Sequence, residues 1–145
     1  MLNIVPQPID EHRAQVLEWL LDEHREHGTG FYCNRGVIER GFRNSSVHCL
    51  VLDGYAIAFA LVNCFDTEAV IDIMEVHPRH RRCGHGRLFT KHVLQYFSRE
   101  GAKSVEVECT PETSEPFWRA MGFVDLDASD RCLGEPVRLK WIVPR

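Results

Sequence analysis

The sequence lacks the features that mark several common classes of protein. No apolar run approaches the roughly 20 residues that a membrane-spanning helix needs, and residues 1–8 do not join a basic segment to an apolar one, as a secretory leader does. The six cysteines include no C-x-x-C motif and no close pair, which favours free thiols in a reducing compartment. The eight histidines show no metal-ligand spacing, so we expect no metal site. Together these absences predict a cytoplasmic protein that does not insert into a membrane.

The sequence also has no excess of positive charge. Its 145 residues carry a formal net charge of −4 at pH 7, whereas proteins that bind nucleic acid need a broad basic surface. Arginines instead gather locally, between residues 79 and 87. We therefore expect one small polyanionic ligand and no nucleic acid. With 44% hydrophobic and 26% charged residues, the chain is predicted to form a single domain over residues 1–145.

The hydrophobic patterning predicts a mixed α/β chain. Apolar runs indicate strands at residues 2–5, 47–52, 55–65, 69–76, 104–109 and 137–142, and a further strand starting at residues 122–123. Helical spacing predicts helices over residues 10–27, around 37–42, over 87–100 and over 114–121. The Asp53-Gly54 pair between two strands is a hairpin signal. The strand, helix and strand between residues 69 and 109 form a crossover, which makes those two strands parallel.

The first predicted helix carries an apolar stripe. Val16, Leu17, Leu20 and Leu21 recur at helical spacing, so this face should pack on the core. Trp19 lies off the stripe, and we expect it either to pack against a neighbouring element or to help wall a substrate cleft.

The most informative segment runs from Val76 to Arg87 and joins a strand end to the start of a helix. It reads R-x-x-G-x-G from Arg81 to Gly86. Glycines let the backbone approach a ligand, and the first amides of a helix have no intrahelical partners, so the segment suits a phosphate or pyrophosphate. A dinucleotide-binding fingerprint would need a third glycine where Phe89 stands, and a Walker loop would need Gly-Lys-Ser/Thr. Both are therefore excluded.

The R-x-x-G-x-G segment resembles the Q/R-x-x-G-x-G/A motif of the GNAT superfamily of acyl-CoA N-acyltransferases. A second segment, Phe117 to Phe123, reads F-W-R-A-M-G-F and is similar to the F-Y-x-x-x-G-F that these proteins often carry at this place. The resemblance implies a GNAT-like α/β (α+β) fold with a mixed six- to seven-stranded sheet. It implies an antiparallel N-terminal meander, a parallel central pair of strands and helices on both faces. It also implies coenzyme A as the cofactor, in the form of acetyl-CoA.

The resemblance further implies which residues contact the cofactor. Main-chain groups of Met74 and Val76 would bind the pantetheine arm as an added strand. The loop residues that would bind the pyrophosphate are Arg81, Arg82, Cys83, Gly84, His85, Gly86 and Arg87. Trp118 stands where the family frequently has a tyrosine that protonates the departing thiolate, a step for which the indole N–H is too weak an acid. Either another group or solvent is the acid, or the protein only binds acyl-CoA.

The amine acceptor must lose a proton before it attacks. A carboxylate in an apolar setting has a raised pKa and can accept that proton. Strand alternation places Asp72 on the face shared with Met74 and Val76, and Glu75 on the opposite face. We predict Asp72 as the base, with Glu75, solvent alone, or a purely structural role for Asp72 as the alternatives.

The segment between residues 28 and 41 carries Phe31 and Tyr32 on a loop flanked by glycine. By its place in GNAT proteins it resembles the variable part that covers the acceptor site. The same two aromatic side chains are equally suited to anchoring a loop in the core.

The predicted function is transfer of an acetyl group from acetyl-CoA to a primary amine of a small molecule or peptide, by direct attack in a ternary complex. The alternative is a non-catalytic acyl-CoA-binding regulatory module of the same fold. A monomer or a homodimer is expected.

Overall fold

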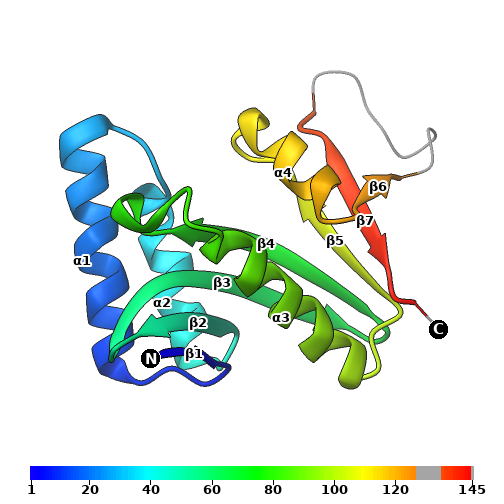
Figure 1. Ribbon diagram of the computed structural model, residues 1–145, viewed down its shortest axis with the longest axis horizontal. Coiled ribbons are helices and arrows are strands. Elements are labelled where there is room, and N and C mark those ends of the chain that lie inside the picture. Colours follow the sequence, from blue (N-terminus) through cyan, green and yellow to red (C-terminus); the bar gives the residue numbers. More distant parts are fainter. Residues whose placement is uncertain (127–134, 145) are drawn as a thin grey trace. The chain divides into compact units, whose positions relative to one another are not determined.

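The structure is a computed structural model that describes residues 1–126 and 135–144 (Figure 1). Its strands are β1 (Leu2–Val5), β2 (Val47–Leu52), β3 (Tyr55–Phe65), β4 (Glu68–Val76), β5 (Ser104–Glu108), β6 (Val124–Asp125) and β7 (Arg138–Ile142). Its α-helices are α1 (Asp10–His27), α2 (Arg35–Arg43), α3 (His85–Arg99) and α4 (Glu115–Ala120). Short 3₁₀ helices are η1 (Tyr32–Asn34), η2 (Pro78–His80) and η3 (Glu112–Ser114).

Within the described residues, the strands form one mixed sheet of seven strands in the order β1-β2-β3-β4-β5-β7-β6. β1 pairs antiparallel with β2, and β2 pairs antiparallel with β3. β4 and β5 run parallel, with Glu68 opposite Ser104 and Ile71 opposite Val107, because α3 returns the chain between them. The predicted mixed sheet, with its antiparallel meander and its parallel pair, is confirmed.

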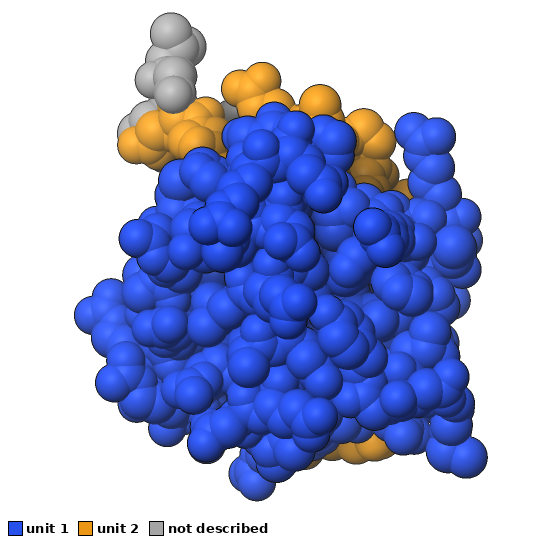
Figure 2. Space-filling view, turned by 90° about the vertical axis from the view of Figure 1, so that its left-hand side faces the viewer, with its two compact units in different colours: residues 1–62, 73–92 blue, residues 63–72, 93–145 orange. Residues whose placement is uncertain are grey.

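The described chain forms two compact units (Figure 2). Unit 1 comprises Met1–Val62 and Ile73–His92, and unit 2 comprises Asn63–Asp72 and Val93–Arg145. The long elements β3, β4 and α3 contribute residues to both units. The single domain expected for residues 1–145 stays a prediction.

The core of unit 1 joins the first two helices to the meander. Its hydrophobic cluster consists of Val16, Trp19, Leu20, Ile38, Val47, Cys49, Val51, Ala56, Phe59, Leu61 and Ile73. Burying one large apolar side chain stabilises a fold by about 1.5–3 kcal/mol, so this cluster fixes α1 and α2 against the strands. Phe31 and Tyr32 are partly buried and pack against it. These two aromatic side chains therefore anchor the connection between α1 and α2, which is one of the two roles that the sequence allows.

The buried face of α1 differs from the predicted stripe. The buried residues of the helix are Val16, Trp19, Leu20 and Glu23. The predicted Leu17 and Leu21 are only half-buried. Trp19 also lies in the core. Its Nε1–H donates a 3.0 Å hydrogen bond to the carbonyl oxygen of Ala56, which satisfies the polar end of the buried ring. The buried face of α1 is thus rotated by about one residue from the predicted face, and its last buried residue is Glu23.

Unit 2 contains β5, β6, β7 and α4, together with parts of β3, β4 and α3. β5 pairs antiparallel with β7, and β7 with β6. Trp118 of α4 is buried, with ring centroids 5.1 Å from Phe117 and 5.2 Å from Phe123. Arg119 Nη2 lies 2.9 Å from Asp125 Oδ1, which ties α4 to β6. The F-W-x-x-x-G-F segment therefore has a packing role at this end of the sheet.

The cysteines of the described residues are free thiols. These residues are Cys33, Cys49, Cys64, Cys83 and Cys109. Burial raises the pKa of the Cys49 thiol, so this residue behaves as a small apolar core group. Cys132, the sixth cysteine, lies outside the described residues.

Substitutions at the two glycines of α2 would test how closely this helix packs on the sheet. A Cβ at Gly41 would collide with Leu61 Cδ1 and lie 3.0 Å from Val47 Cγ2, whereas a Cβ at Gly36 would meet nothing within 4 Å. Gly41→Ala should lower the free energy of unfolding by about 1–3 kcal/mol through overpacking. Gly36→Ala should raise it by about 0.5–1 kcal/mol because alanine is the better helix former. Urea denaturation measures both values, and equal effects would contradict the close approach of α2 to β2 and β3.

Candidate functional site

The R-x-x-G-x-G segment forms an exposed turn between β4 and α3 in unit 1. Arg82, Cys83, Gly84 and Arg87 are exposed, and His85 begins α3. The φ angles of Arg82 and Gly84 are 62° and 81°, and a Cβ on Gly84 would meet no protein atom within 4 Å. The glycine therefore leaves open space beside the start of α3, where the first amides have no intrahelical partners.

Positive charge surrounds this turn. The side chains of Arg79, Arg82 and Arg87 are exposed, and the N-terminus of a helix adds about half a positive charge. His77 Nδ1 accepts a 3.0 Å hydrogen bond from the Arg79 amide. Burial and the neighbouring positive groups lower the pKa of His77. The turn is thus both accessible and electropositive, which fits a pyrophosphate ligand.

The other residues predicted to contact the cofactor lie in both units. The Val76 carbonyl oxygen accepts a 2.9 Å hydrogen bond from Arg81 Nε, and the sulfur of Met74 lies 3.3 Å from Thr90 Oγ1 of α3. Met74 and Val76 belong to unit 1, and both are half-buried. Trp118 belongs to unit 2 and is buried. Contact between these three residues and a cofactor stays a prediction.

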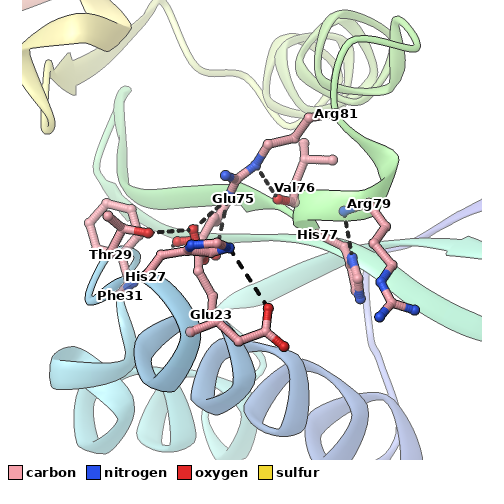
Figure 3. Close-up of polar contacts among 10 residues, drawn as sticks. Glu23, His27, Thr29, Phe31, Glu75, Val76, His77, Arg79 and Arg81 are labelled. Carbon is pink, nitrogen blue, oxygen red and sulfur yellow. Dashed lines mark hydrogen bonds and ion pairs between the residues drawn. The ribbon is translucent and has the colours of Figure 1, made fainter.

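Arg81, the first residue of the motif, contacts two carboxylates in unit 1 (Figure 3). Its Nη2 atom lies 3.1 Å from Glu23 Oε2 and 3.6 Å from Glu75 Oε2. Together with the bond from Nε to the Val76 carbonyl, these contacts fix the guanidinium plane at the exit of β4. The predicted contact between Arg81 and the pyrophosphate stays a prediction.

Glu23 and Glu75 form a buried pair of carboxyl groups. Their relative exposures are 4% and 8%, and Thr29 Oγ1 and the Phe31 amide donate 3.1 Å hydrogen bonds to Glu23 and Glu75 respectively. Burial, followed by the hydrogen bond and the charge of Glu23, raises the pKa of Glu75 to about 9. Burial opposes ionisation of Glu23 too, but its hydrogen bond to Glu75 and the charge of Arg81 leave the pKa of Glu23 below its ordinary value. The pair therefore favours a state with one proton.

The sequence patterns do not identify Glu23, and they indicate Glu75 only as an alternative to Asp72 for the base. The face of Glu75 is as predicted, since its carboxyl accepts a hydrogen bond from Phe31 in the loop after α1, whereas the sulfur of Met74 lies against Thr90 of α3. The signal for Glu23 was its spacing. It lies three residues after Leu20 and seven after Val16, so a carboxylate occupies a core position of an amphipathic helix.

Asp72, the predicted base, lies in unit 2 and has a polar setting. It is exposed, and its carboxylate accepts a hydrogen bond from the Asn63 side chain. It lines a cavity of about 500 Å³ in the same unit. The charged residues of this acidic cavity are Asp72, Glu106, Glu108, Glu135 and Arg138. The buried setting that a raised pKa requires is found at Glu75, and a catalytic role for Asp72 stays a prediction.

Comparisons with known proteins identify the family. The model of the acetyltransferase (GNAT) family matches residues 10–123, which is most of the chain. No curated protein sequence matches. The chain belongs to the GNAT acetyltransferase family, and the family that the two sequence motifs predict is confirmed.

Solved structures show the same fold. A GNAT-family acetyltransferase from Staphylococcus aureus Mu50 is 12% identical with a TM-score of 0.76, over 99% of this chain and 100% of that one. The ribosomal-protein-S18-alanine N-acetyltransferase of Escherichia coli is 15% identical with a TM-score of 0.75, over 100% and 96%. The PaiA N-acetyltransferase of Thermoplasma acidophilum, solved in complex with coenzyme A, is 12% identical with a TM-score of 0.73, over 99% of both chains.

Two further findings concern the described residues alone. None of their helices combines the length and the apolarity that crossing a membrane requires. Their histidine, cysteine and acidic side chains form no group of three placed to hold a metal ion.

The buried carboxyl of Glu75 predicts a pH dependence of stability. Its pKa is raised from an ordinary value of 4.5 to about 9, so the stability that its protonated form contributes is fully present below about pH 4.5 and is lost as the pH rises through about 9. Glu75→Gln keeps the uncharged shape. The free energy of unfolding of Glu75→Gln should therefore fall less than that of the wild type between about pH 5 and about pH 9.

Urea denaturation at several pH values measures this difference. Glu68→Gln, which removes an exposed carboxyl from the same strand, is the matched control and should give a curve parallel to the wild type. If the Glu75→Gln curve is parallel as well, Glu75 is not protonated in the fold.

Proposed function

We propose that the protein transfers an acetyl group from acetyl-CoA to a primary amine of a small molecule or peptide, by direct attack of the amine in a ternary complex. The observation that carries this proposal is the buried carboxyl of Glu75, one residue before the end of the strand that leads into the electropositive turn. Membership of the GNAT family supports the class of reaction. Two of the fold relatives described above are named as N-acetyltransferases, which supports an amine as the acceptor.

Acetyl-CoA is the cofactor that the turn fits. Amides and side chains from Arg82 to Arg87 would hold its pyrophosphate, main-chain groups of Met74 and Val76 its pantetheine arm, and Trp118 would add packing. When bound, acetyl-CoA would supply the thioester whose acyl carbon the amine attacks. The open space at Gly84 and the positive charge around it support this assignment.

Glu75 would accept the proton that the amine must lose. An alkyl ammonium group has a pKa near that of lysine, about 10.4, and an ordinary carboxylate is far too weak a base for it. Burial and the charge of Glu23 raise the pKa of Glu75 to about 9, which brings donor and acceptor close enough for efficient transfer. The ionised fraction of Glu75 grows with pH, so turnover should rise toward that value.

The acidic cavity of unit 2 supports a cationic acceptor. Its four carboxylates outnumber its one arginine, Arg138, which already lies 3.0 Å from Glu106. The remaining negative charge attracts an ammonium group and raises its local concentration. Asp72 is part of this cavity and stays the alternative base.

A non-catalytic acyl-CoA-binding module is the second candidate. Trp118 favours it, because no phenol stands there to protonate a departing thiolate. Such a module would bind acetyl-CoA without turnover. The cytoplasmic location and the monomeric or homodimeric state stay predictions from the sequence.

Acetyl-CoA should stabilise the protein through the turn at Gly84. A ligand at about 100 times its dissociation constant adds about 2.7 kcal/mol to the free energy of unfolding. Gly84→Val should abolish the resulting rise in melting temperature, because its side chain fills the open space and its backbone cannot hold a φ of 81° without strain. Thermal denaturation with and without acetyl-CoA measures the effect.

The matched control is Gly54→Val in the turn between β2 and β3. Gly54 has a φ of 83° and nothing within 4 Å of its would-be Cβ, so the valine imposes the same backbone strain away from the cofactor turn. This variant should melt lower but keep the full shift with acetyl-CoA. A shift retained by Gly84→Val would refute the cofactor assignment.

Turnover should distinguish the two candidate bases. Glu75→Gln removes the proton acceptor and keeps the shape, so kcat should fall roughly 10²- to 10⁴-fold while the affinity for acetyl-CoA changes little. Asp72→Asn changes an exposed residue of the acidic cavity and should mainly raise the KM of a cationic amine. The reverse pattern, in which kcat falls only in Asp72→Asn, would identify Asp72 as the base.

A further inference from the structure

Glu23 and Glu75 reach one another from separate elements of unit 1. Glu23 lies on the last third of α1, and Glu75 lies near the end of β4. Among the described residues, Glu23 Oε1 and Glu75 Oε2 are buried and have no hydrogen-bond donor. Buried carboxylate oxygens without a donor are costly. Both carboxyl groups contact the same nitrogen, Arg81 Nη2, so they face one another at close range. A proton on one carboxyl would supply the donor that two ionised carboxylates lack.

Arg81 is the cation of this cluster. It contacts both carboxyl groups through one nitrogen, Nη2, and the carbonyl of Val76 through Nε (Figure 3). One arginine opposite two carboxylates leaves one negative charge, and a single proton neutralises it. The charge balance therefore favours one proton held by the pair.

The loop after α1 encloses the same pair. Thr29 Oγ1 donates to Glu23, and the Phe31 amide donates to Glu75. Between them the backbone of Gly30 packs so closely that a Cβ there would overlap Glu23 Oε1 and lie 2.9 Å from Glu75 Oε1. The loop supplies hydrogen bonds but no charge. The charged groups that face Glu75 are thus Glu23 from α1 and Arg81 from the segment after β4.

We propose that Glu23 and Arg81 are positioning residues for Glu75, Glu23 by sharing its proton and Arg81 by holding the two carboxyl groups together. The proposal rests on the proposed function, in which Glu75 accepts the proton of the amine. The negative charge of Glu23 increases the proton affinity of Glu75, and the positive charge of Arg81 decreases it. The motif's first arginine thereby serves the carboxyl pair, while Arg82, Arg87 and the helix amides serve the cofactor.

The proton step then balances as follows. The pair first releases its shared proton to solvent, which leaves both carboxyl groups ionised beside Arg81. The ammonium N–H bond breaks, an O–H bond forms on Glu75, and the electron pair stays on nitrogen. Glu23 then shares the new proton. This sequence requires the pair to be doubly ionised, so the acidic limb of the kcat profile follows the loss of the shared proton.

The test follows kcat against pH in Glu23→Gln and Arg81→Gln. Removing the negative neighbour should move the acidic limb to lower pH, and removing the positive neighbour should move it to higher pH, each by on the order of one pH unit. Residues with a merely structural role would lower kcat at every pH and leave the limb in place. Opposite shifts support the proposal, and an unmoved limb in both variants overturns it.

Arg81→Lys covers the case in which Arg81→Gln does not fold. Lysine keeps the charge and loses the Nε bond to Val76, so the limb should stay near that of the wild type. If the limb of Arg81→Lys instead moves by about one pH unit or more although the charge is kept, the charge of Arg81 does not set the proton affinity of Glu75 and the positioning role is refuted.

Carbon-13 NMR of glutamate labelled at the side-chain carboxyl gives a readout that needs no substrate. The resonance missing in Glu75→Gln assigns Glu75, and its titration should shift in the same opposite directions in the two variants. Opposite shifts without turnover of any amine would support the pair and refute the proposed function. Turnover with an unshifted Glu75 titration would support the function and refute the pair.

Discussion

The arrangement of the candidate site depends on the charge balance of one buried cluster. Two carboxylates removed from water repel each other, and each loses hydration at a cost of several kcal/mol. Arg81, Thr29 and the Phe31 amide compensate for this loss by direct contacts with Glu23 and Glu75. Because the partners come from α1, its following loop, β4 and the R-x-x-G-x-G turn, the cluster joins these four segments at one point. The contacts of the cluster therefore help to hold these four segments together.

Local sequence signals were enough to predict the framework of this site. Apolar alternation, the Asp53-Gly54 turn and the crossover through α3 define the meander and the parallel pair, because each depends on neighbours close along the chain. The glycines and arginines of the turn act through backbone freedom and charge, so their accessible, electropositive setting was also predictable. Alternation placed Glu75 opposite Met74 correctly for the same local reason.

The chemistry of the carboxylates was not predictable in the same way. Whether a carboxylate is buried depends on what covers it. Glu75 is covered by the loop at residues 29–31 and faces Glu23 of α1, and both lie more than forty residues away in sequence. Asp72 alternates with apolar residues just as a buried group would, yet it is exposed beside Asn63. The predicted apolar face of α1 differs from the observed one by about one residue, because Leu17 and Leu21 follow the spacing of core residues but are only half-buried. Trp19 is buried instead, and its indole N–H is satisfied by a hydrogen bond. That error also concealed Glu23.

Acetyl transfer to an amine is the central claim, and a direct assay of turnover tests it most simply. Acetyl-CoA is incubated with the protein and a panel of polyamines, aminoglycosides, amino acids and peptides, while release of the coenzyme A thiol is followed and the products are weighed by mass spectrometry. Thiol release that depends on one of these amines, with one acetyl group gained by the amine per thiol released, is the expected result. Saturable binding of acetyl-CoA without amine-dependent release across the panel would contradict the account and identify the chain as an acyl-CoA-binding module.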